Sequence, residues 1–199
     1  MINMNGELSR TKRITYTGML IGLAVAMRLA KQALFGSMQF INFPGVFTIL
    51  SGVMFGPTTG MVVGFSSYLL SDMIIGLPGP WTAINAILMA SLGLASGLIW
   101  GRKTNVNVSK TGLAIGSYML MFAFDIFASC LWYIMIGWNW IYAFTLGLVG
   151  LFLPAGGGYL IGIGPITEAT TTLLIVAIVQ ALRNSRVGFN KKSFIAAKS

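Results

Sequence analysis

The sequence contains no histidine, one cysteine and only four acidic residues among 199. Transition-metal centres use His, Cys and carboxylate ligands, so this composition predicts no metal site. The lone Cys130 excludes a disulfide framework. There is no Gly-x-Ser-x-Gly turn, and Gly156-Gly157-Gly158 lacks the lysine of a phosphate-binding loop. We therefore expect neither an enzyme nor a bound cofactor.

Charged residues are also scarce. They make up 9% of the chain, while hydrophobic residues make up 56%; in a soluble domain about a quarter of residues are charged. Several apolar stretches reach the ~20 residues that a bilayer-spanning helix needs. The composition predicts an all-α integral membrane protein, which we expect to be a compact bundle of six transmembrane helices.

The net charge of +9 would suggest a nucleic-acid partner in a soluble protein, but its distribution favours a membrane orientation. Most of the Lys and Arg residues fall in three groups: Arg10, Lys12 and Arg13; Arg102, Lys103 and Lys110; and Arg183, Arg186, Lys191, Lys192 and Lys198. The positive-inside rule then places both termini in the cytoplasm. We expect a cytoplasmic lead over residues 1–13, a substrate-binding transmembrane domain over 14–183 and a basic cytoplasmic tail over 184–199. The predicted location is the cell membrane, with no nucleic-acid partner.

Glycine and proline residues divide the apolar part into segments. The expected helices are Ile14–Phe35, a short Gly45–Phe55, Thr58–Ile75, Trp81–Trp100, Thr111–Ile136 and Pro165–Leu182. Residues 36–44 form an outer loop that is short enough to fold over a cavity as a lid. Residues 137–164 are apolar enough for another span, but a seventh crossing would place the basic C-terminus outside. We expect instead a re-entrant or surface-lying cap, held at the membrane interface by Trp138, Trp140 and Tyr142.

The turn between the second and third expected helices organises the chain. Pro57 has no backbone N–H and a fixed φ, which suits the first turn of a new helix. Gly60 and Gly64, four residues apart, give that helix a small-residue face that another helix can approach closely. The same helix carries an acid, Asp72, near its far end.

Phe55-Gly56-Pro57, followed by Gly60, Gly64 and Asp72, resembles the substrate-binding S components of energy-coupling factor (ECF) vitamin transporters. In that family a short helix runs into a Phe-Gly-Pro-type turn, and the next, Gly-spaced helix often ends in an acid. The resemblance extends to the chain length and helix count. It implies high-affinity capture of a vitamin or vitamin precursor on the outer face. It also implies delivery with a transmembrane coupling subunit and two ATPases, by toppling of the whole bundle.

The first expected helix carries a stripe of small residues spaced by four: Gly18, Gly22, Ala26 and Ala30. Arg28 and Lys31 lie on other faces of this helix. Because charges inside a membrane normally face the bundle or water, the stripe is predicted to face outward. S components use an Ala-x-x-x-Ala pattern here to meet the coupling subunit, and Gly22, Ala26 and Ala30 fit it. The alternative is that the stripe packs against a neighbouring helix of the same chain.

Five charged residues lie outside the basic groups: Arg28, Lys31, Asp72, Asp125 and Glu168. Each would cost roughly 2.5–3.5 kcal/mol at the centre of a bilayer. The expected helix directions place all five in the outer half of the bundle. Internal pairing of the two cations with the three anions would explain them; so would a water-accessible cavity in which they bind substrate, which we favour.

Aromatic residues are expected at the same level. Asp125, Ser129 and Trp132 follow helical spacing, as do Trp81 and Asn85. Aromatic side chains with a few directional polar groups suit a planar heterocyclic ligand, although an aromatic belt at the membrane surface is the alternative. The predicted substrate-binding set is Glu168, Asp125, Trp132, Asn85, Trp81, Arg28, Lys31 and Asp72.

Two other functions fit the composition. In a proton-coupled secondary transporter, Asp125 or Glu168 would carry the proton. That function would predict inverted halves, but the Gly-Pro turn is not repeated in the second half. In a structural membrane protein without transport activity, the inner charges would only pair with one another.

Overall fold

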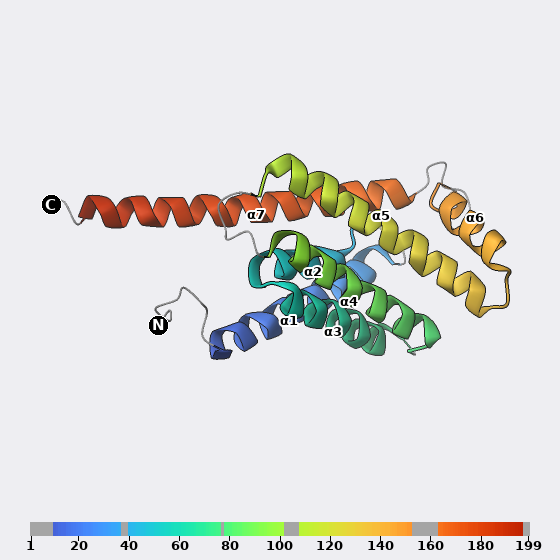
Figure 1. The fold of residues 1–199 in the computed structure, drawn as a ribbon. Coiled ribbons are helices and arrows are strands. Elements are labelled where there is room, and N and C mark those ends of the chain that lie inside the picture. The colour runs from blue at the N-terminus through green and yellow to red at the C-terminus, as the bar shows by residue number, and fades with distance from the viewer. Residues whose placement is uncertain (1–9, 37–39, 77, 102–107, 153–162, 197–199) are drawn as a thin grey trace.

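A computed structural model describes residues 10–36, 40–76, 78–101, 108–152 and 163–196. The described part is helical throughout, without strands, and its order is α1 (Arg10–Phe35), α2 (Phe43–Phe55), α3 (Pro57–Ile75), α4 (Pro80–Trp100), α5 (Lys110–Met135), α6 (Trp140–Gly150) and α7 (Ile163–Ala196) (Figure 1). The helices pack side by side, and the C-terminal part of α7 projects from one end of the bundle.

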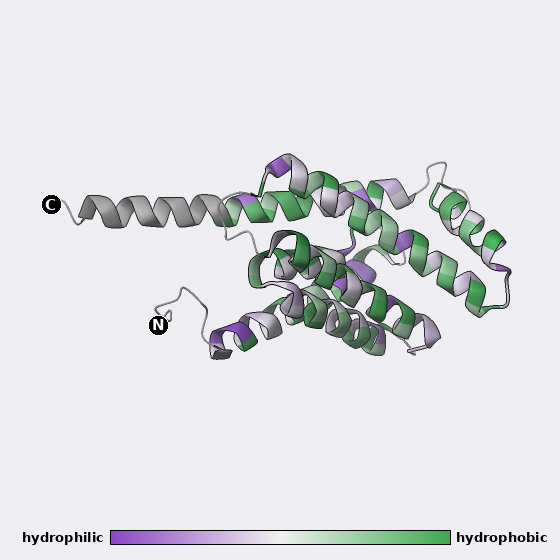
Figure 2. Cartoon of the chain, in the orientation of Figure 1, coloured by the Kyte–Doolittle hydropathy of each residue, from purple (hydrophilic) through white to green (hydrophobic). Residues whose placement is uncertain are grey.

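The lengths of the helices divide them into two classes. α1, α3, α4, α5 and α7 are long and apolar enough to cross a membrane, and hydrophobic residues recur along these helices (Figure 2). α2 has 13 residues and α6 has 11, which at 1.5 Å per residue is about 20 Å or less against a ~30 Å hydrocarbon core. The predicted all-α membrane bundle is confirmed. A sixth crossing depends on α2 and stays a prediction.

The predicted boundaries lie close to the observed ones except at two places. α7 continues as a helix to Ala196, through the segment expected to be a tail. Within residues 137–164, expected to form a cap, α6 packs against α5 through Ala143 and Gly147. Residues 153–162 of that segment lie outside the described residues. The chain therefore has one more helix in this region than the six that were expected.

Gly56 alone connects α2 and α3, and its φ of +91° is in the region that favours glycine. Arg13 of α1 binds this turn: Nη2 donates to the Phe55 carbonyl oxygen at 2.6 Å, and Nε donates to Thr59 Oγ1 at 3.1 Å. A cation at the last carbonyl of α2 offsets the negative end of the helix dipole. Tyr16 also stacks on Phe55, with ring centroids 5.5 Å apart. These contacts tie α1 to the turn.

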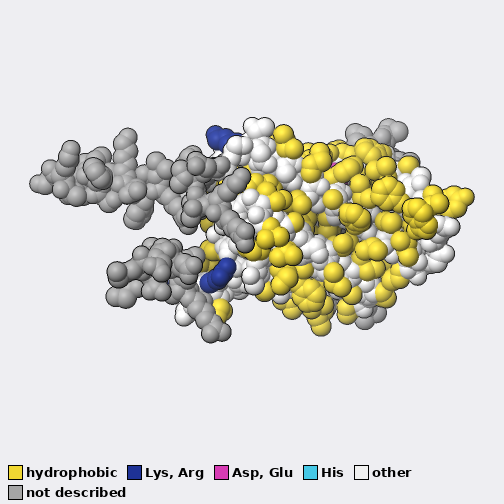
Figure 3. Space-filling view, in the orientation of Figure 1, with side chains coloured by type: hydrophobic (Ala, Val, Ile, Leu, Met, Phe, Trp, Pro, Cys, Tyr) yellow, Lys and Arg dark blue, Asp and Glu magenta, His cyan; other side chains and the backbone are white. Residues whose placement is uncertain are grey.

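The described basic residues outside the bundle interior gather at one end, which we call the basic end. Lys12 and Arg13 lie near the start of α1 and Lys110 begins α5. Figure 3 shows Lys and Arg side chains at this end of the molecule. The opposite end, where α3 gives way to α4 and α5 to α6, is called the far end.

Glycines bring α2, α3 and α4 into close contact. A Cβ at Gly60 would overlap the Gly93 carbonyl, and one at Gly93 would overlap the Gly60 carbonyl. Gly64 lies in the same way against the Met89 carbonyl. The predicted small-residue face of α3 is therefore confirmed, and its partner is α4. Ile49, Val63 and Met89 are fully buried among these helices.

The segment before α2 is bound to α7. The Asn42 side chain caps α2 by accepting from Gly45 N at 3.0 Å, while the Asn42 N–H donates to Thr171 Oγ1 at 2.9 Å. The Thr170 hydroxyl donates to the Phe40 carbonyl. Residues 40–42 of the loop predicted to be a lid thus lie on α7; residues 37–39 lie outside the described residues.

Candidate functional site

The first polar cluster at the far end is built around an ion pair. Arg28 of α1 and Asp72 of α3 meet with Nη2 and Oδ1 2.7 Å apart. The other Asp72 oxygen accepts from the Thr82 hydroxyl of α4 at 2.7 Å. Arg28 also donates to the Ser71 hydroxyl. An acid near the end of α3 is unfavourable to the helix dipole, and these partners compensate it while joining three helices.

Tyr68 connects this cluster to α5. The Arg28 guanidinium carbon lies 4.4 Å from the centroid of the Tyr68 ring, a cation–π arrangement. The ring tilts against Phe124, with centroids 5.9 Å apart, and the hydroxyl interacts with the Asn42 side chain. Tyr68 is buried, and its contacts with Arg28 and Phe124 join α1, α3 and α5 inside the bundle.

The second cluster is an acid pair between α5 and α7. Asp125 and Glu168 are close enough for their carboxyl groups to interact electrostatically. Glu168 is 0% exposed, and neither of its carboxyl oxygens has a well-formed hydrogen bond to any residue that the structure describes. Thr172 lies one turn further along α7, and its buried hydroxyl likewise has no partner in the described chain.

The five inner charges thus fall into two groups. Arg28 and Asp72 pair, and Lys31, which is 5% exposed, lies near Arg28. Asp125 and Glu168 lie across the bundle on α5 and α7. Tyr68 lies between the groups, because it interacts with Arg28, Asp72 and Asp125. Pairing of Arg28 with Asp72 agrees with the internal-pairing alternative, and their contact with substrate stays a prediction.

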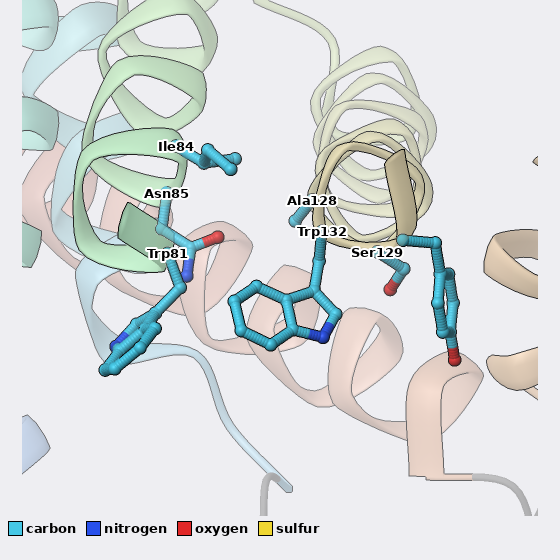
Figure 4. Close-up of a pocket in the computed structure, with 7 residues that line it drawn as sticks. Trp81, Ile84, Asn85, Ala128, Ser129 and Trp132 are labelled. Atoms are coloured by element: carbon cyan, nitrogen blue, oxygen red, sulfur yellow. The ribbon is translucent and has the colours of Figure 1, made fainter. Parts of the chain in front are cut away.

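A cavity of about 240 Å³ lies between the start of α4 and the end of α5. It is lined by Trp81, Ile84 and Asn85 from α4 and by Ala128, Ser129, Trp132 and Tyr133 from α5. Figure 4 shows Trp132 and Ser129 on one side, facing Asn85 and Trp81 on the other. The two indole rings meet edge to face, with centroids 5.8 Å apart and planes at 76°.

The cavity brings together three of the predicted residues, Trp81, Asn85 and Trp132. None of the five inner charges is among its lining residues, but Asp125 precedes Ser129 by one helical turn on α5. The Trp81 ring covers Gly79, where a Cβ would overlap it. Glycine at this position therefore allows the ring its place at the cavity.

Residues 8–180 match the family described as ECF-type riboflavin transporter, S component. The chain belongs to this family. The predicted resemblance to an ECF S component is thereby confirmed, and the chain is a multi-pass membrane component of a vitamin transporter rather than an enzyme. No curated protein and no solved structure matches it.

The small-residue stripe of this S component faces away from the bundle. Gly22, Ala26 and Ala30 are all exposed, and a Cβ added at Gly22 would meet no atom within 4 Å. The opposite face of α1 is buried through Leu20 and Ala24. The outward direction expected for the stripe is therefore observed, while its contact with a coupling subunit stays a prediction.

Sequence reasoning missed several residues at the far end of this S component, chiefly Tyr68, Ser71 and Thr82. Gly64, Tyr68 and Asp72 follow four-residue spacing along α3, so they share a face. This spacing was the signal that could have identified Tyr68. Thr82 could have been identified only from the structure of the turn between α3 and α4, because its partner Asp72 lies on another helix.

Proposed function

We propose that this S component binds riboflavin at the far end of the bundle. The observation that carries the proposal is the cavity between Trp81 and Trp132, with Asn85 and Ser129 beside them. Aromatic walls with a few polar groups suit a flat heterocycle, and the riboflavin ring system is flat and edged with hydrogen-bonding atoms. The amide of Asn85 can both donate to and accept from such an edge.

The cavity is smaller than the ~300–1,000 Å³ of typical ligand pockets, so the whole vitamin needs adjoining space. Asp125 lies one turn along α5 from the cavity, and Glu168 lies beside it. We assign the ring to the aromatic cavity and the hydroxyl-bearing chain to these acids, which accept hydrogen bonds from hydroxyl groups. Arg28, Lys31 and Asp72 complete the proposed site from α1 and α3.

Delivery follows from the orientation of the bundle. The positive-inside rule supports a cytoplasmic location for the basic end and for both termini, so riboflavin would enter at the outer face. The exposed Gly22, Ala26 and Ala30 of α1 offer a close-packing surface for a transmembrane coupling subunit. In this proposal the subunit and its two ATPases drive toppling of the bundle, and binding is of high affinity.

The proposal is tested by titrating the purified chain with riboflavin and following flavin fluorescence. Replacing Trp132 or Trp81 with Ala removes one aromatic wall, and stacking on a heterocyclic base is worth about 1–3 kcal/mol. We therefore expect the Kd to rise about 5- to 150-fold. Trp140→Ala is the matched control, because Trp140 is 70% exposed and does not line the cavity. Unchanged affinity in both cavity variants would refute the proposed site.

A further inference from the structure

The acid pair between α5 and α7 lies apart from the ion pair of Arg28 and Asp72. Glu168 is fully buried, and neither of its carboxyl oxygens has a well-formed hydrogen bond in the described chain; the group that interacts with it is Asp125, a second acid rather than a cation. The Arg28 guanidinium is engaged by Asp72 at 2.7 Å. The ion pair with Arg28 therefore satisfies Asp72, whereas Asp125 and Glu168 face each other as two acids.

Titratable side chains on α5, α3 and α1 lie around the acid pair. Tyr118, on α5 itself, interacts with Glu168. Tyr68 of α3 interacts with Asp125 and, on its other side, with Arg28 and Asp72. Lys31 of α1 lies near Arg28. Tyr118 and Tyr68, which interact with the two carboxyls, are phenols and are neutral near pH 7.

Two adjacent negative charges destabilise each other in a low-dielectric interior, because desolvation and mutual repulsion add. A positive ion between the carboxyls removes both costs. The available donors are all oxygens: two carboxyls and the unpaired hydroxyl of Thr172, one turn from Glu168. Oxygen-only sites suit hard cations.

We propose that Asp125, Glu168 and Thr172 bind one monovalent cation, either a proton or a sodium ion, when no vitamin is bound. Both ions carry a single positive charge and bind to oxygen atoms, but they need different oxygen atoms of the site. A proton needs only the carboxyl groups, whereas a sodium ion also uses the Thr172 hydroxyl. The site goes beyond riboflavin binding, because it exists in the ligand-free protein.

The test measures the melting temperature of the purified, ligand-free chain in sodium chloride and in choline chloride, from about pH 8 to about pH 5. If sodium is the ion, sodium chloride raises the wild-type Tm by about 3 °C or more relative to choline chloride, and Thr172→Val removes the difference. If a proton is the ion, Tm rises by a similar amount on acidification in either salt, and Thr172→Val leaves the rise in place.

Glu168→Gln and Asp125→Asn should each abolish the response, because each replaces one of the two adjacent carboxyls by a neutral amide. Thr48→Val is the control: it removes another fully buried hydroxyl that has no partner in the described chain, on α2, and should retain the response. A wild-type Tm that ignores both sodium and pH overturns the proposal without any variant. An equal response in wild type, Glu168→Gln and Asp125→Asn also overturns it, as does its loss in Thr48→Val. Riboflavin is absent throughout, so failure here is distinct from failure of the vitamin site.

Discussion

The ion pair between Arg28 and Asp72 leads to a prediction about what holds the far end together. Asp72→Asn keeps an oxygen that can accept from Thr82 but removes the negative charge that faces Arg28. Arg28→Gln removes the positive charge and its contact with the Tyr68 ring. The double variant removes both charges at once.

The expected magnitudes follow from burial. The Arg28 and Asp72 side chains are 16% and 10% exposed, so water compensates neither charge well. Losing one partner of a buried pair typically costs 3–5 kcal/mol, and an unpaired charge in a membrane helix costs roughly 2.5–3.5 kcal/mol. We expect each single change to lower the free energy of unfolding by about 3 kcal/mol. The double variant should lose less than the sum, with a coupling energy of about 1–3 kcal/mol.

The assay is reversible unfolding in mixed micelles for the wild type and the three variants, with a riboflavin titration of each. Additive losses would refute the argument that the pair stabilises the far end. A result in which Asp72→Asn weakens riboflavin binding but leaves stability unchanged would instead assign Asp72 to the ligand, as the sequence predicted.

Four further predictions address the remaining elements. Glu168→Gln and Asp125→Asn should each weaken riboflavin binding by about 1.5–3 kcal/mol, the scale of a hydrogen bond to a charged group; unaltered titrations would remove the acids from the vitamin site. Ala26→Trp or Ala30→Trp should reduce co-purification with the coupling subunit while riboflavin binding persists, because an indole prevents close helix approach; full complex yield would exclude the stripe from the interface. Gly60→Val should lower the Tm sharply, since a Cβ there overlaps the Gly93 carbonyl, whereas Gly18→Ala, with no atom within 4 Å, should not; similar melting of the two would contradict glycine-mediated packing. A cysteine introduced at Ser199 should react with a membrane-impermeant label only from the cytoplasmic side, and labelling from outside would reverse the orientation.

The helices were predictable because local chemistry marks their ends. Pro57 and Pro80 open α3 and α4, where a missing N–H costs nothing, and Gly56 allows the turn between α2 and α3. The continuation of α7 to Ala196 was not predicted. Its basic residues were assigned to a tail because the expected span ends at Leu182, but loss of hydrophobicity ends a span without necessarily ending a helix.

The candidate site was predicted in part. Trp81, Asn85 and Trp132 line one cavity. Helical spacing places Trp81 and Asn85 on the same face of one helix, and Trp132 lies on the next helix along the chain. Which charges pair could not be read from the sequence, since that depends on which helices are neighbours. Arg28 meets Asp72 because α1 packs against α3, whereas Glu168 lies on α7 beside α5. Tyr68 was missed although it shares a four-residue spacing with Gly64 and Asp72, because spacing alone does not show whether a tyrosine packs or binds.

The short α2 has a consequence for biogenesis. Its 13 residues are fewer than the ~17–25 of a typical spanning helix, so we expect α2 alone to be too short for stable insertion into the bilayer. One glycine separates it from α3, and the glycine-lined contacts with α3 and α4 supply the packing that its length cannot. We expect α2 and α3 to enter the bilayer as one hairpin. A cysteine placed in α2 should therefore react with a membrane-impermeant label when the nascent chain is arrested before α3 emerges from the ribosome, and should be protected when it is arrested after α3.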